Sequence, residues 1–279
     1  MCSAALAAST LLMVPMGANA GFTVFEAAGS TPASITPTRD EFRVAIGGGT
    51  VASPNGNFGG LRREINWDGI PDAFADPNAM PADFFNVNSP RGAVFSSPDG
   101  AGFMVSANAS TATPTLFGFP ADFQAFSSQR LFALVGGRTT DIRFFVPGTN
   151  TVATTSAFGA IFVDLEDNTS EVFTKMEFFD LGGNLIFSRN GMAAGNQGLT
   201  FLGGLADAGE RIARVSITTS DNFILGNGLR DNETVDIVVM DDFIYASPAA
   251  VPEPGIWAMV LLGLGVVGWH SRRRGAMPR

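Results

Sequence analysis

The chain has 279 residues, a formal net charge of −9, one cysteine (Cys2) and one histidine (His270). Both lie in end segments that resemble processing signals, so residues 21–250 contain no thiol nucleophile, imidazole base or Cys/His zinc site. Those residues carry 25 acids against 13 bases, a net charge of −12, which repels nucleic-acid phosphates. Composition therefore excludes Ser-His-Asp and Cys-His catalysis and argues against a nucleic-acid partner. Carboxylate chemistry stays open.

Glycine (33 residues) and phenylalanine (25 residues) are both abundant, whereas tyrosine occurs once. Apolar aromatics mixed with turn-forming residues are typical of many short strands joined by tight turns. The residues between the two ends, about 230 of them, suit one all-β domain. We therefore expect a single β domain, residues 21–248, between an N-terminal and a C-terminal processing segment.

The first twenty residues have the pattern of a secretory signal peptide. Ala4 to Met16 form a short run of small and apolar residues, and Ala18-Asn19-Ala20 is an A-x-A cleavage pattern. We expect cleavage after Ala20, which makes Gly21 the first mature residue. No Lys or Arg precedes the apolar run, so we expect the natural translation start to lie upstream. The alternative is a buried N-terminal helix.

Residues 22–100 begin with a strand-like segment and then become rich in turn formers. Phe22 to Phe25 predict a strand, and Arg39 to Ile46 have helical character that ends at Gly47-Gly48-Gly49. Pro, Gly, Asn and Asp then recur every few positions through residues 47–100, which predicts mostly loop.

A tryptophan lies in this loop-rich region, in the segment Ile65 to Asp72. Trp67 beside Asp68, Asp72 and an asparagine could form a sugar-stacking platform with hydroxyl-binding partners. Alternatively, Trp67 fills the core while Asp68-Gly69 makes a turn. Trp67, Asp68 and Asp72 are therefore candidate ligand-binding residues with a structural alternative.

Beyond residue 100, short apolar segments predict a series of strands. The clearest alternation places Ala213, Val215 and Ile217 on one face. Leu181-Gly182-Gly183-Asn184 predicts a hairpin turn. This spacing favours an antiparallel β-sandwich of jelly-roll type. The predicted strands are 102–107, 131–135, 141–146, 157–165, 171–180, 185–188, 199–202, 211–219 and 234–245.

The last predicted strand contains two adjacent acids. Strict alternation places Asp241 on the apolar face that includes Val239 and Phe243, whereas a bulge would place Asp242 there. A buried carboxylate needs an arginine, a set of backbone donors or a cation.

The C-terminus combines three elements in order. Val251-Pro252-Glu253-Pro254 precedes the almost wholly apolar residues 255–269, and Arg272, Arg273 and Arg274 follow. Fifteen helical residues cover about 22 Å, short of the roughly 30 Å hydrocarbon core. Trp257 and Trp269 at the interfaces and snorkelling arginines extend that reach, which predicts a C-terminal transmembrane helix. An ordinary tail anchor is the alternative.

Residues 251–274 closely resemble the PEP-CTERM sorting signal of exported bacterial proteins. The resemblance implies that an exosortase, a membrane transpeptidase-like enzyme, recognises the tail and cuts near the motif. The protein would then be held only transiently in the membrane and would end in the cell envelope or outside the cell.

The body also resembles domains found upstream of such tails and, through the strand 234–245, lectin-like and carbohydrate-binding-module sandwiches. Those sandwiches often hold a structural Ca²⁺ with an acid from the last strand, and Ca²⁺ requires 6–8 oxygen ligands. The resemblance therefore implies a candidate calcium site. Its candidate ligands are Asp164, Glu166, Asp167, Asp241 and Asp242.

These observations predict an exported, non-enzymatic surface or matrix protein associated with exopolysaccharide or biofilm. One alternative is a glycan-binding module that acts through the Trp67 loop. The other is a carboxylate-based glycoside hydrolase, since two acids about 5–10 Å apart suffice for that chemistry.

Overall fold

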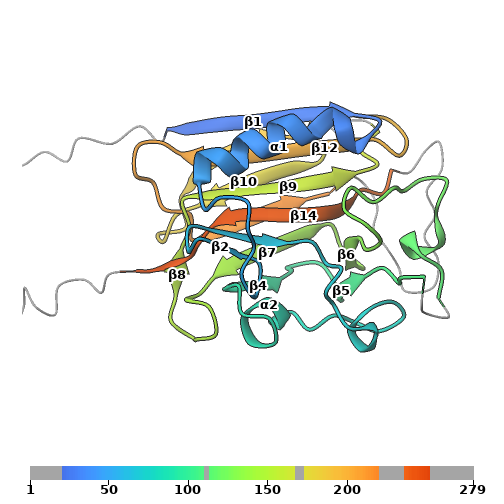
Figure 1. Ribbon diagram of the computed structural model, residues 1–279, viewed down its shortest axis with the longest axis horizontal. Coiled ribbons are helices and arrows are strands. Elements are labelled where there is room, and N and C mark those ends of the chain that lie inside the picture. The colour runs from blue at the N-terminus through green and yellow to red at the C-terminus, as the bar shows by residue number, and fades with distance from the viewer. Residues whose placement is uncertain (1–20, 110–112, 167–172, 220–235, 252–279) are drawn as a thin grey trace, which may run out of the picture.

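The computed structural model of the protein describes residues 21–109, 113–166, 173–219 and 236–251. These residues form two sheets that pack face to face, with every strand pairing antiparallel (Figure 1). The predicted all-β antiparallel sandwich is therefore confirmed.

The larger sheet, sheet A, has eight strands. Its main path runs β1-β12-β9-β14-β3-β2, and β6 joins it through β14 and pairs in turn with β5. The bounds are β1 Phe22–Gly29, β2 Asn57–Phe58, β3 Arg62–Ile65, β5 Gly102–Val105, β6 Phe132–Val135, β9 Ala157–Val163, β12 Leu199–Ala206 and β14 Val239–Ala246.

The smaller sheet, sheet B, has five strands in the order β11-β10-β13-β7-β4. A two-stranded ladder of β8 and β15 closes the C-terminal end of the described chain. The bounds are β4 Ala93–Ser96, β7 Thr139–Phe144, β8 Ala153–Thr154, β10 Lys175–Phe179, β11 Leu185–Asn190, β13 Arg214–Thr218 and β15 Ala249–Ala250.

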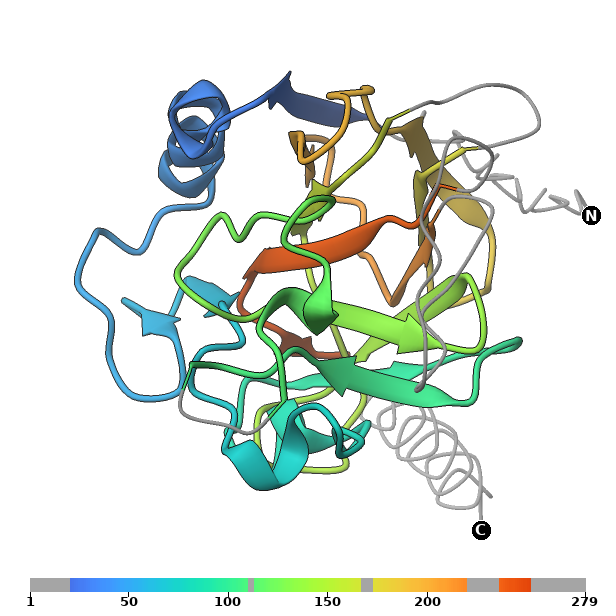
Figure 2. The ribbon, with the colours of Figure 1, turned by 90° about the vertical axis from the view of Figure 1, so that its right-hand side faces the viewer.

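Two helices cover opposite sides of the sandwich. Helix α1 (Pro32–Ile46) lies along the outer face of sheet A, and the short α2 (Phe84–Val87) lies on the far side of the molecule (Figure 2). The predicted helix at 39–46 thus begins earlier, at Pro32, where a proline fits the first turn because its missing N–H has no helical partner there. No helix in the described part of the chain is long and apolar enough to span a membrane, and the predicted helix 255–269 lies outside that part.

Sheet A is apolar on both faces. Its inner face packs against sheet B through an aromatic core that includes Phe95, Phe132, Phe158 and Phe243. Its outer face packs against α1, whose Phe42 ring lies so close to β9 and β12 that a Cβ at Gly203 would sit 3.1 Å from it. Because both faces are covered, β9 and β14 are buried along their whole length and do not show a simple alternation.

Strand β14 contains the bulge that the sequence left open. Its pairing with β9 shifts between Met240 and Phe243, so Asp241 and Asp242 together lie opposite one residue of β9. Val239 packs in the outer core and Met240 in the inner core, whereas beyond the bulge Phe243 is inward. Strict alternation through Asp241 was therefore wrong, because the extra residue reverses which positions face inward.

Other predicted strands are confirmed with shifted ends, and β2, β3 and β4 lie in residues predicted to be mostly loop. These three strands have two to four residues each, too few to show a period of two. Strand β3 is the important omission, because it carries part of the site described below.

Candidate functional site

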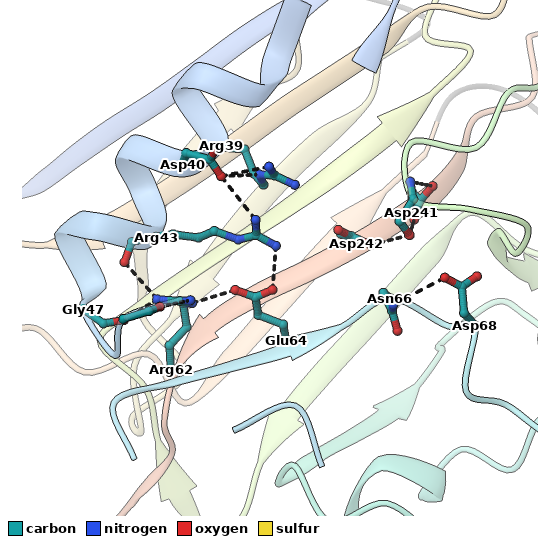
Figure 3. A network of polar contacts seen from close by, with 12 residues as sticks. Arg39, Asp40, Arg43, Gly47, Arg62, Glu64, Asn66, Asp68, Asp241 and Asp242 are labelled. Atoms are coloured by element: carbon teal, nitrogen blue, oxygen red, sulfur yellow. Dashed lines mark hydrogen bonds and ion pairs between the residues drawn. The ribbon is translucent and has the colours of Figure 1, made fainter. Parts of the chain in front are cut away.

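A polar network crosses the space between α1 and β3 on the outer side of sheet A (Figure 3). From α1, Arg39 Nε donates to Asp40 Oδ1 at 2.9 Å, and Arg43 Nη1 contacts the same oxygen at 3.2 Å. Arg43 Nη2 then reaches across to Glu64 Oε2 of β3 at 2.6 Å. One helix face and one strand are thus joined through charged side chains.

Arg62 completes the network from the strand side. Its Nε donates to Glu64 Oε1 at 2.6 Å, and its Nη2 donates to the Gly49 carbonyl at 2.9 Å. Its Nη1 donates to the carbonyl oxygens of Arg43 and Gly47. The Arg62 side chain is only 3% exposed and that of Glu64 12%. Arg62 therefore fixes the end of α1 to β3, and both Glu64 oxygens are held by guanidinium groups.

The network borders two adjoining hollows of about 400 and 680 Å³. Both are lined by Arg39, Arg43 and Phe58. We call the smaller hollow the α1–β3 cleft. Its lining residues are Arg39, Arg43, Ala52, Gly56, Phe58, Glu64, Asn66, Arg91, Ser127 and Asp242.

Arg91, just before β4, brings a third guanidinium group to the cleft. Its Nη1 donates to Ser89 Oγ at 2.9 Å, and its Cζ lies 4.8 Å from the ring centre of Phe85. Burial lowers the pKa of Arg91, and nearby Arg63 lowers it further. Gly56 borders this guanidinium so closely that a Cβ there would lie 2.7 Å from Arg91 Nε.

Donors and acceptors in the cleft are unevenly used. The Nε groups of Arg43 and Arg91 are buried and have no acceptor among the described residues. The carboxylate of Glu64, by contrast, accepts from two arginines. These two Nε groups are enclosed by protein, so a ligand in the cleft would meet the outer Nη groups of the arginines and the Asp242 carboxyl group.

The bulge acids lie at the other end of the cleft. Asp241 Oδ2 accepts from the backbone N–H groups of Phe126 at 2.6 Å and Ser127 at 3.2 Å. Ser127 Oγ lies 3.1 Å from Asp241 Oδ1 and 2.9 Å from Asp242 Oδ1. Of the three partners considered for a buried carboxylate, backbone donors are the ones observed for Asp241.

Both acids titrate above the ordinary carboxyl range. Burial, followed by the neighbouring Asp242, raises the pKa of Asp241 well above its ordinary value, although the Phe126 and Ser127 donors oppose the change. Burial also raises the pKa of Asp242, against hydrogen bonds from Ser127 and Asp241. The pair therefore retains a proton where isolated aspartates have lost theirs.

Trp67 does not form the predicted platform. Its side chain is 1% exposed, its ring stacks on Phe132 at 4.2 Å between centroids, and Nε1 donates to the Asp241 carbonyl at 2.8 Å. Phe85 and Phe243 contact it edge-on. A sugar cannot stack on a ring enclosed in this way, so the structural alternative, Trp67 in the core, is correct.

The two acids predicted beside Trp67 bind a neighbouring arginine. Asp72 Oδ1 lies 2.5 Å from Arg130 Nη2, and Asp68 Oδ1 accepts from the Arg130 backbone N–H at 3.2 Å. Asn66 Nδ2 donates to Asp68 Oδ2 at 3.3 Å. Asp68 and Asp72 therefore hold Arg130 and do not form a polar rim around an exposed tryptophan ring.

The predicted calcium ligands are not brought together. Asp164 Oδ1 accepts from the Gln197 backbone N–H at 2.7 Å, whereas Asp241 is held by residues 126–127. Glu166 is exposed, and Asp167 lies outside the described residues. No group of three or more His, Cys, Asp or Glu side chains suited to a metal forms among the residues that the structure describes. The calcium expectation is therefore not supported.

The arginine-lined cleft was missed at the sequence level. A clue was present: Arg62-Arg63-Glu64 is a run of charges in a chain with only 13 bases between residues 21 and 250. Pairing that run with residues 39–43 and 91 requires the tertiary fold.

The processing segments lie mostly outside the described residues. Ala18 and Ala20, Pro252 to Pro254 and Arg272 to Arg274 are all in this category. Val251 is described, and its N–H donates to the Val152 carbonyl at 3.3 Å, next to the β8–β15 ladder. The described residues thus begin directly after the predicted signal cleavage site and end at the first residue of the predicted sorting motif.

Comparison with known proteins identifies one feature. Residues 250–274 match the family described as the PEP-CTERM protein-sorting motif. No curated protein matches the chain. The motif implies an exported protein, an envelope location and exosortase as the processing partner.

Proposed function

We propose that this chain, which carries a PEP-CTERM sorting motif, is a non-enzymatic envelope or matrix protein that associates with extracellular polysaccharide. The observation that carries the proposal is the position of the motif, which starts at residue 250, the last residue of β15. No further folded element separates the sandwich from the sorting signal. The sandwich is thus the part delivered outside, with the tail as a transient membrane anchor.

The α1–β3 cleft supports the polysaccharide assignment. Its volume, about 400 Å³, lies within the range of small-ligand sites. Its guanidinium and carboxylate groups are held by one another, so few rotamers would be lost when a sugar binds. Planar polar side chains fixed in this way are suited to recognising hydroxyl and carboxylate groups.

A glycoside hydrolase is the second candidate, because Glu64 and Asp242 line the same cleft and burial raises the pKa of Asp242. Against it, arginines hold both oxygens of Glu64, which makes this carboxylate a poor base or nucleophile. Reducing-end release from isolated exopolysaccharide decides between the two. We expect none above background; release by the wild type that Asp242→Asn abolishes would establish the enzyme.

Fractionation tests the sorting proposal. We expect the protein in the envelope or medium of cells with exosortase, with a mass that corresponds to cleavage near residues 251–254. Cells without exosortase should retain a longer form in the membrane. Intact protein in the cytosol of the native host would contradict the proposal. Co-sedimentation of the mature protein with exopolysaccharide from the same cells tests the polymer association.

A further inference from the structure

We propose that the α1–β3 cleft binds acidic groups of the polysaccharide, with the guanidinium group of Arg91 as the main recognising donor and those of Arg39 and Arg43 as neighbouring positive charges. This inference rests on the proposed function and narrows its ligand class to a polymer that carries carboxylates, such as a polyuronate. It differs from the sequence-based hypothesis because Trp67, Asp68 and Asp72 do not line the cleft, although Asn66 of the same segment does.

The first support is the distribution of charge. Residues 21–250 have a net charge of −12, yet three arginines (Arg39, Arg43 and Arg91) and only two acids (Glu64 and Asp242) line this one cleft. The adjoining hollow adds Arg62 and Asp40. The overall negative charge disfavours a general attraction to polyanions, so an acidic polymer would have to be recognised at a local excess of arginine.

The second support is the unequal use of donors and acceptors. Glu64 is saturated by Arg43 and Arg62, and Asp40 Oδ1 accepts from Arg39 and Arg43. Arg91, by contrast, pairs with no acid among the described residues, and its Nη2 makes no hydrogen bond to a described residue. A ligand that supplies a carboxylate would give this guanidinium the partner that the other arginines of the network already have.

The third support is the environment of Arg91. No ion pair within the described residues involves Arg91, whose guanidinium donates to Ser89 and lies over the Phe85 ring. Because Nε is enclosed and Nη1 donates to Ser89, Nη2 is the group of Arg91 left to donate to a ligand. A hydrogen bond from a guanidinium to a carboxylate is stronger than one between neutral groups.

The test uses the full chain, kept in a mild non-ionic detergent, and three soluble probes. Polygalacturonate carries carboxylates, dextran sulfate carries sulfates, and dextran is neutral. Affinity electrophoresis through gels that contain each polymer reports binding. We expect retardation by polygalacturonate and none by dextran. Equal retardation by all three polymers, or by dextran sulfate alone, would overturn the carboxylate assignment.

The key variant is Arg91→Gln, and its matched control is Arg143→Gln. Arg143 lies exposed on sheet B and lines neither the α1–β3 cleft nor the adjoining hollow, so both variants lose one positive charge. Arg91→Gln should weaken polygalacturonate binding by about tenfold or more, since it removes a charged donor. Arg143→Gln should stay within about twofold, as expected for a distant surface charge. Equal losses in both would show non-specific attraction and overturn the proposal.

Three further measurements keep the result interpretable. Arg91→Lys retains the charge without the planar fork, so we expect an intermediate affinity. Thermal melting checks that Arg91→Gln is folded. Native exopolysaccharide, run beside polygalacturonate, separates this inference from the proposed function. If the protein binds the native polymer but not polygalacturonate, the carboxylate assignment is wrong and the proposed function stands. If it binds polygalacturonate but not the native polymer, the carboxylate assignment stands and the proposed function is wrong.

Discussion

The two sides of the β3–β14 pair differ sharply in chemistry. On the inner side, Trp67 is enclosed by four phenylalanine rings. On the outer side, Arg43, Arg62 and Glu64 form a charged network around the α1–β3 cleft. The β14 bulge joins the sides, because the Asp241 carbonyl accepts from Trp67 and its carboxylate accepts from residues 126–127.

Rare or charged residues on the two sides therefore differ in what they do. A lone tryptophan beside acids suggests a ligand site, yet here it stabilises the core. Charged residues on a short strand, which look like ordinary surface, form the site. Substitutions on the inner side should therefore change stability and leave ligand binding per folded molecule unchanged. Substitutions at the cleft should weaken ligand binding and change stability less.

The largest expected effect is that of Trp67→Ala on the inner side. Removing a buried indole should lower the free energy of unfolding by about 3–5 kcal/mol, because a cavity opens between the four phenylalanine rings. Urea unfolding followed by circular dichroism measures this. Trp67→Phe is the control, since it keeps most of the volume and loses mainly the bond to the Asp241 carbonyl. A loss below about 1 kcal/mol for Trp67→Ala would break the assignment of Trp67 to the core.

Asp241 tests the bulge that connects the two sides. Asp241→Ala leaves the Phe126 and Ser127 N–H groups without their acceptor and should cost about 2–4 kcal/mol. Asp241→Asn keeps an oxygen for those donors and should cost much less. A similar loss for both substitutions would show that the carboxylate oxygen is not what holds residues 126–127.

Comparing the wild type with Asp241→Asn gives a pH dependence of stability whose sign can be predicted. Because the folded-state pKa of Asp241 is raised, the folded protein binds this proton more tightly than the unfolded chain. The contribution is full below the ordinary carboxyl pKa of about 4 and is lost as pH rises through the raised pKa. Asp241→Asn lacks it. The stability of the wild type relative to Asp241→Asn should therefore fall from pH 4 upward; a constant or rising difference would contradict this.

The smallest stability effect should come from the cleft. Glu64→Gln leaves Arg43 and the nearly buried Arg62 with one neutral oxygen in place of a carboxylate. We expect a loss of about 1–2 kcal/mol, below that of a fully buried pair because Glu64 and Arg43 are partly solvated. Denaturant unfolding measures it. Glu177→Gln, which loses a more exposed pair with Lys175, is the control and should cost less.

Much of the fold could be predicted from the sequence because it depends on local patterns. Val215 and Ile217 are fully buried as expected, although Ser216 between them is also buried, and the glycine turn after β10 lies where it was predicted. Strand β12 was predicted too short, since it continues through Gly203 and Gly204, residues typical of turns. The reason is tertiary: Phe42 of α1 packs directly over Gly203, which leaves no room for a side chain.

The candidate site could not be predicted in the same way. Its parts come from α1, β3, the segment before β4 and the β14 bulge, and only the sheet order brings them together. The sequence indicated that Asp241 needed a partner but not that residues 126–127 supply it. By contrast, the sorting tail was predictable residue by residue, because an enzyme reads it as a linear motif.

The direction of the last strands has a mechanical consequence. Strand β1 begins and β14 ends at the same end of the sandwich (Figure 1). A pull on the C-terminal tail first loads the two-residue β15–β8 ladder and then runs lengthwise along β14, which is flanked by β9 and β3. Antiparallel hydrogen bonds lie perpendicular to that direction, so those on both sides of β14 share the load and must slide together before the strand leaves. A protein tethered by this tail would resist shear forces outside the cell better than one whose terminal strand peels from an edge.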